Sequence, residues 1–448
     1  MVPSGVYGVA ARLELLLDPP ASGCRNILST SRRKYMRIAS MDGKLDRPSV
    51  KQHFDLAEFF IALALGFAFF IAALYFAIQI IGYPGDFHHH AGSRDFISYW
   101  ASGKQLVDHA NPYDPEAISA LEHAEGLNVH DTLVMRNPPW ALPFAYPLGF
   151  VGVRWGAILW SLLVLGCLFL SVRWVCQLYG DPAKTLRWLA LSFTPALICF
   201  LTGQTSMFLL IGLVLFLRLH KTRPFAAGAA LGLCALKPQF FLPFALVLLV
   251  WIVVTRSYRI LAGGMTTMAA CSLITTWIDP AAWSQYAYYV HHSSMTREFT
   301  GYPSELLRDS IHPAWEWLAF VPAILACIWA LAWFWPRRHA WDWIEQGSLL
   351  MLVSLVVAPF GWIFDQSVAI PALVHGARTT RSRTVLAVLA IAILAMDVEF
   401  CLVRVPSPYW LWTTPAWLVW YLFARASSRE QGAMPIPASL SASDTASR

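Results

Sequence analysis

The run GAILWSLLVLGCLFLSVRWVCQ, residues 156–177, decides the fold class of this chain. It holds 22 residues and one charged side chain, Arg173. A bilayer needs about 20 consecutive apolar residues per helix, so this run is long enough to cross a membrane. The whole chain has the same character, because 57% of its 448 residues are hydrophobic and 13% are charged. Soluble proteins carry about 25% charged residues, and the composition therefore indicates a membrane protein and excludes a disordered chain.

Similar apolar runs recur along the sequence and predict an all-α, polytopic integral membrane protein with about 12 transmembrane helices. The short runs around Gly203 and Pro238 are compatible with full helices that have polar ends, or with helices that meet in re-entrant turns. The predicted spans lie near 59–83, 156–177, 188–201, 206–218, 225–236, 239–255, 260–278, 315–335, 346–359, 367–376, 385–403 and 409–423.

Composition divides the chain into three parts. Residues 1–57 are polar and basic, and we expect a cytoplasmic segment there; a translation start at Met36 or Met41 would remove most of it. Residues 58–423 form the membrane domain, with long loops near 84–155 and 279–314. Residues 424–448 are rich in Ser and Ala and predict a disordered tail.

The distribution of Lys and Arg predicts the orientation. Cytoplasmic loops of membrane proteins collect basic residues. A cytoplasmic N-terminus puts most of the 33 Lys and Arg on the cytoplasmic side, and an even number of crossings puts the C-terminus there too. Both long loops are then extracytoplasmic, and the expected location is the cell (inner) membrane. The net charge of +6 is scattered between apolar runs rather than gathered in a patch, so no nucleic-acid partner is expected.

Polar residues at the edges of the predicted spans all fall on the extracytoplasmic side of this topology. Ionisable groups in membrane segments are costly and usually face a bundle interior or a wet cavity. We therefore expect one extracytoplasmic polar site. Its candidate residues are Asp95 in RDFISYWASG, with Tyr99, Asn137 in RNPPW, Gln204 in TGQTS, Lys237 and Gln239 in LKPQF, and Asp365 in WIFDQS.

Asp95 is the candidate for catalysis. If DFISYWAS is helical, Asp95 shares one face with Ser98, Tyr99 and Ser102. A carboxylate beside hydroxyls could act as a general base on a substrate hydroxyl, which typically contributes ~10²–10⁴-fold to a rate. The alternative is an Asp that caps a helix in a loop, and spacing alone favours that alternative.

Lys237 and Asp365 each have two interpretations. Lys237 precedes Pro238 at the end of a span, so its ammonium could bind a substrate phosphate or could extend to lipid headgroups. Asp365 could be a second carboxylate of the site or an ordinary helix cap.

Two histidine groups do not have the spacing of a helical zinc site. These are the run His88–His90 and the pair His291 and His292, which lack the i, i+4 separation. We expect no metal ligands among them, although protonated imidazoles could face a phosphate. The charged residues of the second loop, Arg297, Glu298, Glu305 and Arg308, are expected to be surface charges.

Several motifs together resemble glycosyltransferase family 87, over roughly residues 60–400. They are DFISYWASGKQLVDHANPYDPEAI, RNPPWALPFAYPLGF, LTGQTSMFLLIGLVLFLRL, RPFAAGAALGLCALKPQFFLPFALVLL and APFGWIFDQSVAIPAL, in that order. The resemblance implies a membrane enzyme of the GT-C class. Such enzymes transfer mannose or arabinofuranose from a polyprenyl-phosphate donor to a lipid-linked or glycan acceptor, on the extracytoplasmic face and with inversion.

The resemblance also implies site roles. Asp95 occupies the position of the family's catalytic base, and Lys237 would contact the donor phosphate. This sequence has no second carboxylate beside Asp95, whereas some GT-C families carry a paired motif, so a divalent cation remains an open alternative and no cofactor is assigned. The partners implied are the bilayer, the lipid-linked donor and the acceptor. The alternatives from other classes are a lipid or glycan transporter and a non-catalytic protein of envelope assembly.

Overall fold

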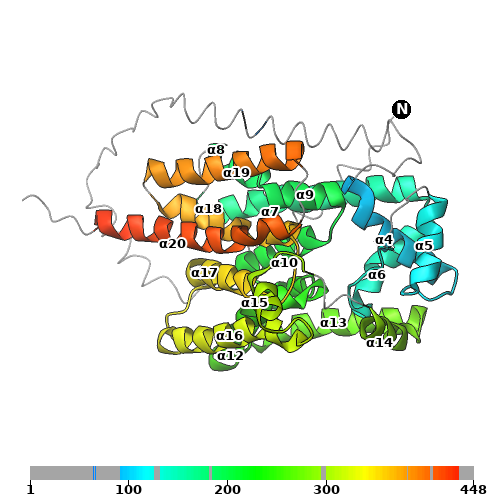
Figure 1. Ribbon diagram of the computed structural model, residues 1–448. Helices are drawn as coiled ribbons and strands as arrows, with labels where there is room; N and C mark the ends of the chain where they lie inside the picture. The colour runs from blue at the N-terminus through cyan, green and yellow to red at the C-terminus, as the bar shows by residue number, and fades with distance from the viewer. Residues whose placement is uncertain are drawn as a thin grey trace, which may run out of the picture. The chain divides into compact units, whose positions relative to one another are not determined.

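The computed structural model describes residues 64, 66, 91–125, 132–180, 184–293, 299–380, 382–403 and 407–432, and the elements within them are all helical (Figure 1). The all-α fold expected from the sequence is therefore confirmed for the part of the chain that is described. The N-terminal segment, most of the first predicted span and His88–His90 lie outside the described residues, as do residues 433–448.

Among the described residues, four helical segments are long and apolar enough to cross a membrane. Helix α7 (Val153–Leu178) and helix α13 (Tyr258–Ile278) are continuous. The other two begin with a 3₁₀ turn: Pro238–Thr255 joins η4 to α12 (Leu242–Thr255), and Glu316–Arg337 contains α16 (Val321–Phe334). These segments confirm a membrane protein, while the expected number of about 12 crossings stays a prediction.

A fifth span is possible if a bent pair of helices counts as one. Helix α8 (Lys184–Leu191) and helix α9 (Thr194–Thr202) meet at an angle of 43°. Pro195 lies in the first turn of α9, where it is tolerated because the first N–H groups of a helix have no partner within it. Gly203 ends α9 in the left-handed conformation, with φ of 73°.

The remaining predicted spans correspond to shorter or more polar helices. Glycine and proline residues, such as Gly232 and Pro359, closely follow some of these helices. The helices are α10 (Ser206–Leu219), α11 (Pro224–Leu231), α17 (Trp343–Val356), α18 (Ile370–Thr379), α19 (Arg383–Val403) and α20 (Thr413–Gly432). Helix α20 continues past Ala424, where we expected a disordered tail to begin.

The described residues of the segment 84–155, which are 91–125 and 132–155, are largely helical. Its elements are α4 (Ala91–Val107), α5 (Pro115–Ala124), η1 (Pro139–Ala141), α6 (Leu142–Ala145) and η2 (Tyr146–Phe150). Gly103 of α4 and Gly149 of η2 lie so close that a side chain on either would meet the other's backbone. This contact holds α4 against η2, and α4 also contacts α9.

The segment 279–314 contains α14 (Ala282–His292) and α15 (Pro303–Ile311). Helix α14 lies beside the first segment, because the rings of Tyr113 and Tyr286 are 5.2 Å apart and the Tyr286 hydroxyl donates to the Arg136 carbonyl at 3.5 Å. Figure 1 shows α4, α5, α6 and α14 at the same end of the described helices. The two long segments between predicted spans therefore contact each other.

Candidate active site

Breaks between helices bring five polar side chains together, and we call these five residues the polar cluster. Tyr99 comes from α4, Gln204 follows the end of α9, and Ser206 begins α10. Lys237 lies between η3 (Cys234–Leu236) and η4 (Pro238–Phe241), and Asp365 lies in η7 (Ile363–Ala369). All five side chains are buried or half-buried.

Lys237 and Asp365 form the centre of the polar cluster. Lys237 Nζ lies 2.6 Å from Asp365 Oδ1, and the two side chains are 10% and 0% exposed. Ser206 Oγ donates to the same oxygen at 2.5 Å, and the Trp362 backbone N–H donates to Asp365 Oδ2 at 3.0 Å. Asp365 thus caps η7 and also pairs with a cation. The Lys237 ammonium points into the protein, so it does not extend to lipid headgroups as one interpretation proposed.

Gln204 joins Lys237 to Tyr99. Its Oε1 accepts from Lys237 Nζ at 3.2 Å and from the Tyr99 hydroxyl at 3.0 Å. Gly203 fixes the position of Gln204. The Gly203 carbonyl accepts from Trp160 Nε1 at 2.6 Å, and a Cβ at Gly203 would come within 2.8 Å of Phe96 Cβ. The chain turn at Gly203 therefore sets how closely α4 approaches the cluster.

Asp95 lies one helical turn before Tyr99 in α4, as the sequence pattern predicted, and its side chain is half-buried. Burial raises the pKa of Tyr99 well above its usual value, and the carboxylates of Asp95 and Asp365 both contribute to that increase. Tyr99 is therefore within electrostatic reach of both carboxylates. The two serines of this face bond to backbone instead of flanking the carboxylate, since Ser98 donates to the Asp95 carbonyl and Ser102 to that of Pro112.

Two candidates lie beside the polar cluster rather than in it. Asn137 Nδ2 donates to the Leu236 carbonyl at 2.8 Å, so Asn137 supports the backbone that leads into Lys237. The Tyr113 hydroxyl in turn donates to the Asn137 carbonyl at 3.1 Å. Gln239 is half-buried and makes no side-chain hydrogen bond within the described part of the chain. The structure therefore does not join Gln239 to the other candidates.

Comparison with known families decides the class of this protein. The family model of glycosyltransferase family 87 matches residues 136–359, which is half of the chain. This chain belongs to glycosyltransferase family 87. It is therefore a membrane glycosyltransferase, with a sugar donor and an acceptor as its substrates. No curated protein and no solved structure matches the chain. Gln204, Ser206 and Lys237 lie inside the matched range, whereas the two carboxylates, Asp95 and Asp365, lie on either side of it.

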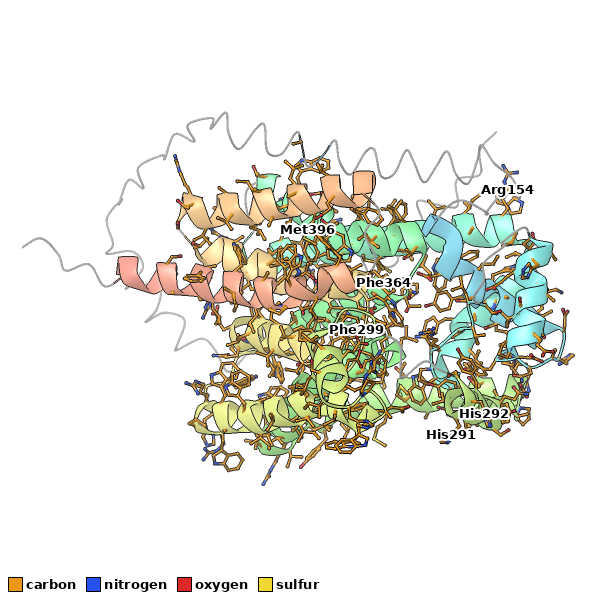
Figure 2. All side chains as sticks on the ribbon, viewed as in Figure 1. Arg154, His291, His292, Phe299, Phe364 and Met396 are labelled. Carbon is orange, nitrogen blue, oxygen red and sulfur yellow. The ribbon has the colours of Figure 1, made fainter. Side chains whose placement is uncertain are left out.

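The family 87 enzyme also has aromatic residues at the site that sequence reasoning missed. The rings of Trp362 and Phe364 stack at 5.9 Å. Lys237 Nζ lies 4.8 Å from the Phe364 ring, and the Arg136 guanidinium lies 5.4 Å from the Trp362 ring. Two cations thus flank one aromatic pair, and each contact is favourable because an aromatic face carries partial negative charge. Figure 2 shows Phe364 in the middle of the described helices, well apart from His291 and His292.

Two of the four residues expected to be surface charges in the second long segment are buried in the glycosyltransferase. Glu305 and Arg308 are buried, at 0% and 2% exposed. Glu305 accepts from the Thr300 backbone, the Thr300 hydroxyl and the Tyr302 backbone at 2.9, 2.7 and 3.0 Å. These bonds fix the start of α15, and the expectation was wrong because Glu305 serves as a capping residue. Arg297 and Glu298 lie outside the described residues.

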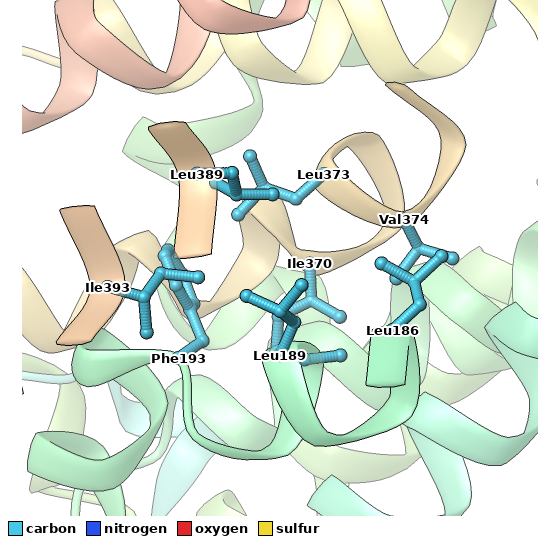
Figure 3. Close-up of a pocket in the computed structure, with 9 residues that line it drawn as sticks. Leu186, Leu189, Phe193, Ile370, Leu373, Val374, Leu389 and Ile393 are labelled. Carbon is cyan, nitrogen blue, oxygen red and sulfur yellow. The ribbon is translucent and has the colours of Figure 1, made fainter. Parts of the chain in front are cut away.

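Other features of the enzyme lie apart from the polar cluster. A cavity of about 10 Å³ between α8, α18 and α19 is lined by apolar side chains alone (Figure 3). A larger cavity of about 480 Å³ is also separate from the polar cluster, because no cluster residue lines it. Its lining residues are Phe169, Val172, Arg173, Gln177, Arg187 and Leu191. Among the described residues, no three His, Cys, Asp or Glu side chains gather as metal ligands would.

Proposed function

We propose that this enzyme transfers mannose or arabinofuranose from a polyprenyl-phosphate donor to a lipid-linked or glycan acceptor on the extracytoplasmic face. The proposal rests on the family assignment together with one observation: Asp95 lies one helical turn before Tyr99, and the Tyr99 hydroxyl bonds to Gln204 of the polar cluster, whose members come from segments far apart in the sequence. A polyprenyl tail stays in the bilayer while its phosphate lies at the surface. An enzyme that uses it needs polar groups near the ends of membrane helices, and Lys237 directly precedes the candidate span Pro238–Thr255.

Asp95 acts as the general base in this proposal. Its carboxylate takes the proton of the acceptor hydroxyl while that oxygen attacks the anomeric carbon of the sugar. The bond between the anomeric carbon and the phosphate oxygen breaks, and the polyprenyl phosphate leaves with one more negative charge than it carried in the donor. Attack opposite to the leaving group inverts the anomeric configuration. Phosphate is a good leaving group, so the protein mainly positions the reactants and stabilises charge.

The polar cluster and its neighbours bind the donor in this proposal. Lys237 provides positive charge toward the leaving phosphate, and Asp365 holds its ammonium in place. Tyr99 and Gln204 connect this pair to the helix of Asp95. Asn137 supports the Lys237 backbone, and Gln239 reaches substrate only after a change of side-chain conformation. We propose no fixed metal; a divalent cation bound with the substrate remains the alternative.

The orientation proposed here follows from the positive-inside rule, with both termini in the cytoplasm and the enzyme in the cell (inner) membrane. Both long segments then face the extracytoplasmic side. Their contact through Tyr113 and Tyr286 supports a common side for them.

The test is product formation by the purified protein in proteoliposomes. Labelled decaprenyl-phosphate mannose and decaprenyl-phosphate arabinofuranose are supplied with a membrane glycolipid extract, and products are separated from donor. We expect new glycosidic product with one of the two donors. Movement of label across the bilayer without a glycosidic product would instead support a transporter. Absence of both product and movement would support the non-catalytic alternative.

A further inference from the structure

Tyr302 lies at the edge of the polar cluster, although it comes from the second long segment. Its ring lies 5.9 Å from the ring of Phe240, which is three residues after Lys237. It also lies against Gly361, where a Cβ would come within 2.9 Å of Tyr302 Cε2. The Gly361 backbone N–H donates to the Thr300 hydroxyl at 3.3 Å. Tyr302 therefore contacts both chain segments that carry the Lys237–Asp365 pair.

The position of Tyr302 is fixed by its own segment. It is the N-cap of α15, and its backbone N–H donates to Glu305 Oε2 at 3.0 Å. Because Glu305 also holds Thr300, the turn before α15 has no freedom to carry the ring elsewhere without breaking three hydrogen bonds. These bonds fix the Tyr302 backbone, and the contacts with Phe240 and Gly361 confine its ring.

The hydroxyl of Tyr302 is buried, and it is unpartnered within the described part of the chain. The residue is 1% exposed, and its Oη has no hydrogen-bond partner among the described residues. Burial raises its pKa well above the usual value, and the nearby carboxylates of Asp365 and Glu305 raise it further, so the hydroxyl keeps its proton and is a donor. A buried hydroxyl without a partner lowers the stability of the fold, and a phenylalanine would fill the same space without that cost.

We infer that the Tyr302 hydroxyl is a substrate-binding group that donates a hydrogen bond to the phosphate of the polyprenyl-phosphate donor. This inference rests on the proposed function for the identity of the ligand. Asp365 is already occupied by Lys237, Ser206 and the Trp362 backbone, so it does not need this donor. A phosphate oxygen held near Lys237 would satisfy both the ammonium and the hydroxyl. Hydrogen bonds to charged groups are stronger than those between neutral groups, so loss of this contact should measurably lower the affinity for the phosphate.

The test compares Tyr302→Phe with the native enzyme in two independent measurements. The first is the thermal shift that polyprenyl phosphate, without a sugar, produces in detergent-solubilised protein. The second is the donor KM of sugar transfer. We expect the affinity for polyprenyl phosphate to fall about tenfold to hundredfold and the donor KM to rise by a similar factor. The acceptor KM stays within about twofold, and the Tm without ligand is unchanged or higher because an unpartnered hydroxyl is removed.

Tyr179→Phe is the matched control, because the Tyr179 hydroxyl already has partners, the Ile344 carbonyl at 3.1 Å and Ser348 Oγ at 3.2 Å, and neither partner belongs to the polar cluster. It should lower the Tm and leave polyprenyl-phosphate affinity unchanged. Unchanged affinity in Tyr302→Phe, or a rise in acceptor KM alone, would overturn the inference. If the native protein binds polyprenyl phosphate through Tyr302 but makes no product, the proposed function fails and the binding inference stands.

Discussion

Lys237 Nζ and Asp365 Oδ1 lie 2.6 Å apart, although the two residues are separated by 128 positions in the chain. The pair joins the segment after η3 to the turn that begins η7. Burying two charges is costly, and it is tolerated here because Ser206, Gln204 and the Trp362 backbone supply further hydrogen bonds. The pair therefore connects two chain segments of the site and also provides its central charges.

Replacing one partner of this pair should destabilise the enzyme strongly. Lys237→Met leaves the buried Asp365 carboxylate without its cation, and we expect a loss of about 3–5 kcal/mol of unfolding free energy. The double variant Lys237→Met with Asp365→Asn should recover at least half of that loss, because no unpaired charge remains, while sugar transfer stays abolished. Thermal unfolding in detergent and a transfer assay measure the two effects.

Lys221→Met is the control for this cycle. Lys221 pairs with Asp342 at 2.9 Å, but the two side chains are 60% and 37% exposed. Exposed pairs contribute about 0–1 kcal/mol, so this variant should differ little from the native enzyme. An equal loss of unfolding free energy in Lys221→Met and Lys237→Met would show that burial does not determine how much the central pair contributes to stability.

Gly203→Ala should damage both stability and transfer. The residue has φ of 73°, which a side chain rarely adopts, and the new Cβ would meet Phe96 Cβ at 2.8 Å. We expect a cost of about 1–3 kcal/mol. Transfer should fall by about tenfold or more, because Gln204 and helix α4 move relative to each other and misplaced groups cost rate. Thermal unfolding and initial rates measure these changes.

Gly166→Ala provides the opposite case in helix α7. A Cβ at Gly166 has no atom within 4 Å apart from its own helix. Alanine is favoured over glycine in a helix by roughly 1 kcal/mol, so the variant should be at least as stable as the native enzyme and equally active. Similar losses in both glycine variants would refute the role of the Gly203 turn.

Histidine 220, in the turn after α10, should make stability depend on pH. Burial lowers the pKa of His220 below its ordinary 6.5. Between that lowered pKa and 6.5 the unfolded chain binds more protons than the folded enzyme, so stability falls as the pH falls through this window. The pH dependence of Tm in His220→Gln should be flatter there and parallel to the native enzyme above pH 7. Identical curves over the whole range would contradict the burial effect.

Most of the polar cluster could be predicted from the sequence because its members interrupt apolar runs. Gln204 and Lys237 lie beside a helix-ending Gly and Pro, and Asp365 follows an apolar segment. The distribution of Lys and Arg then predicted that all three lie on the extracytoplasmic side. Ser206 was missed because a serine at a helix start has an ordinary local explanation, and Tyr302 because nothing local distinguishes it from an interfacial tyrosine.

Tertiary contacts also explain where the other expectations differ from the structure. Gln239 was chosen as a polar residue at the edge of a predicted span; at the 3₁₀ turn after Lys237 it makes no bond to the cluster among the described residues, and its role in substrate binding stays a prediction. Glu305 and Arg308 looked like surface charges because local sequence does not reveal that Thr300 and Tyr302 bond to Glu305. Tertiary contacts decide burial, and single-sequence patterns do not contain them.

The catalytic assignment of Asp95 is tested by Asp95→Asn, with Asp108→Asn as the control. Asp108 ends the same helical region and pairs with Lys104 at 2.8 Å, half-exposed to solvent, so its variant should keep native activity. Both variants should insert into membranes and unfold like the native enzyme.

The turnover of labelled donor by Asp95→Asn measures the central claim most directly. Loss of a general base lowers a rate by ~10²–10⁴-fold, so the transfer rate should fall by at least ~10²-fold while polyprenyl-phosphate binding is retained. Turnover near the native rate in this variant would contradict the account.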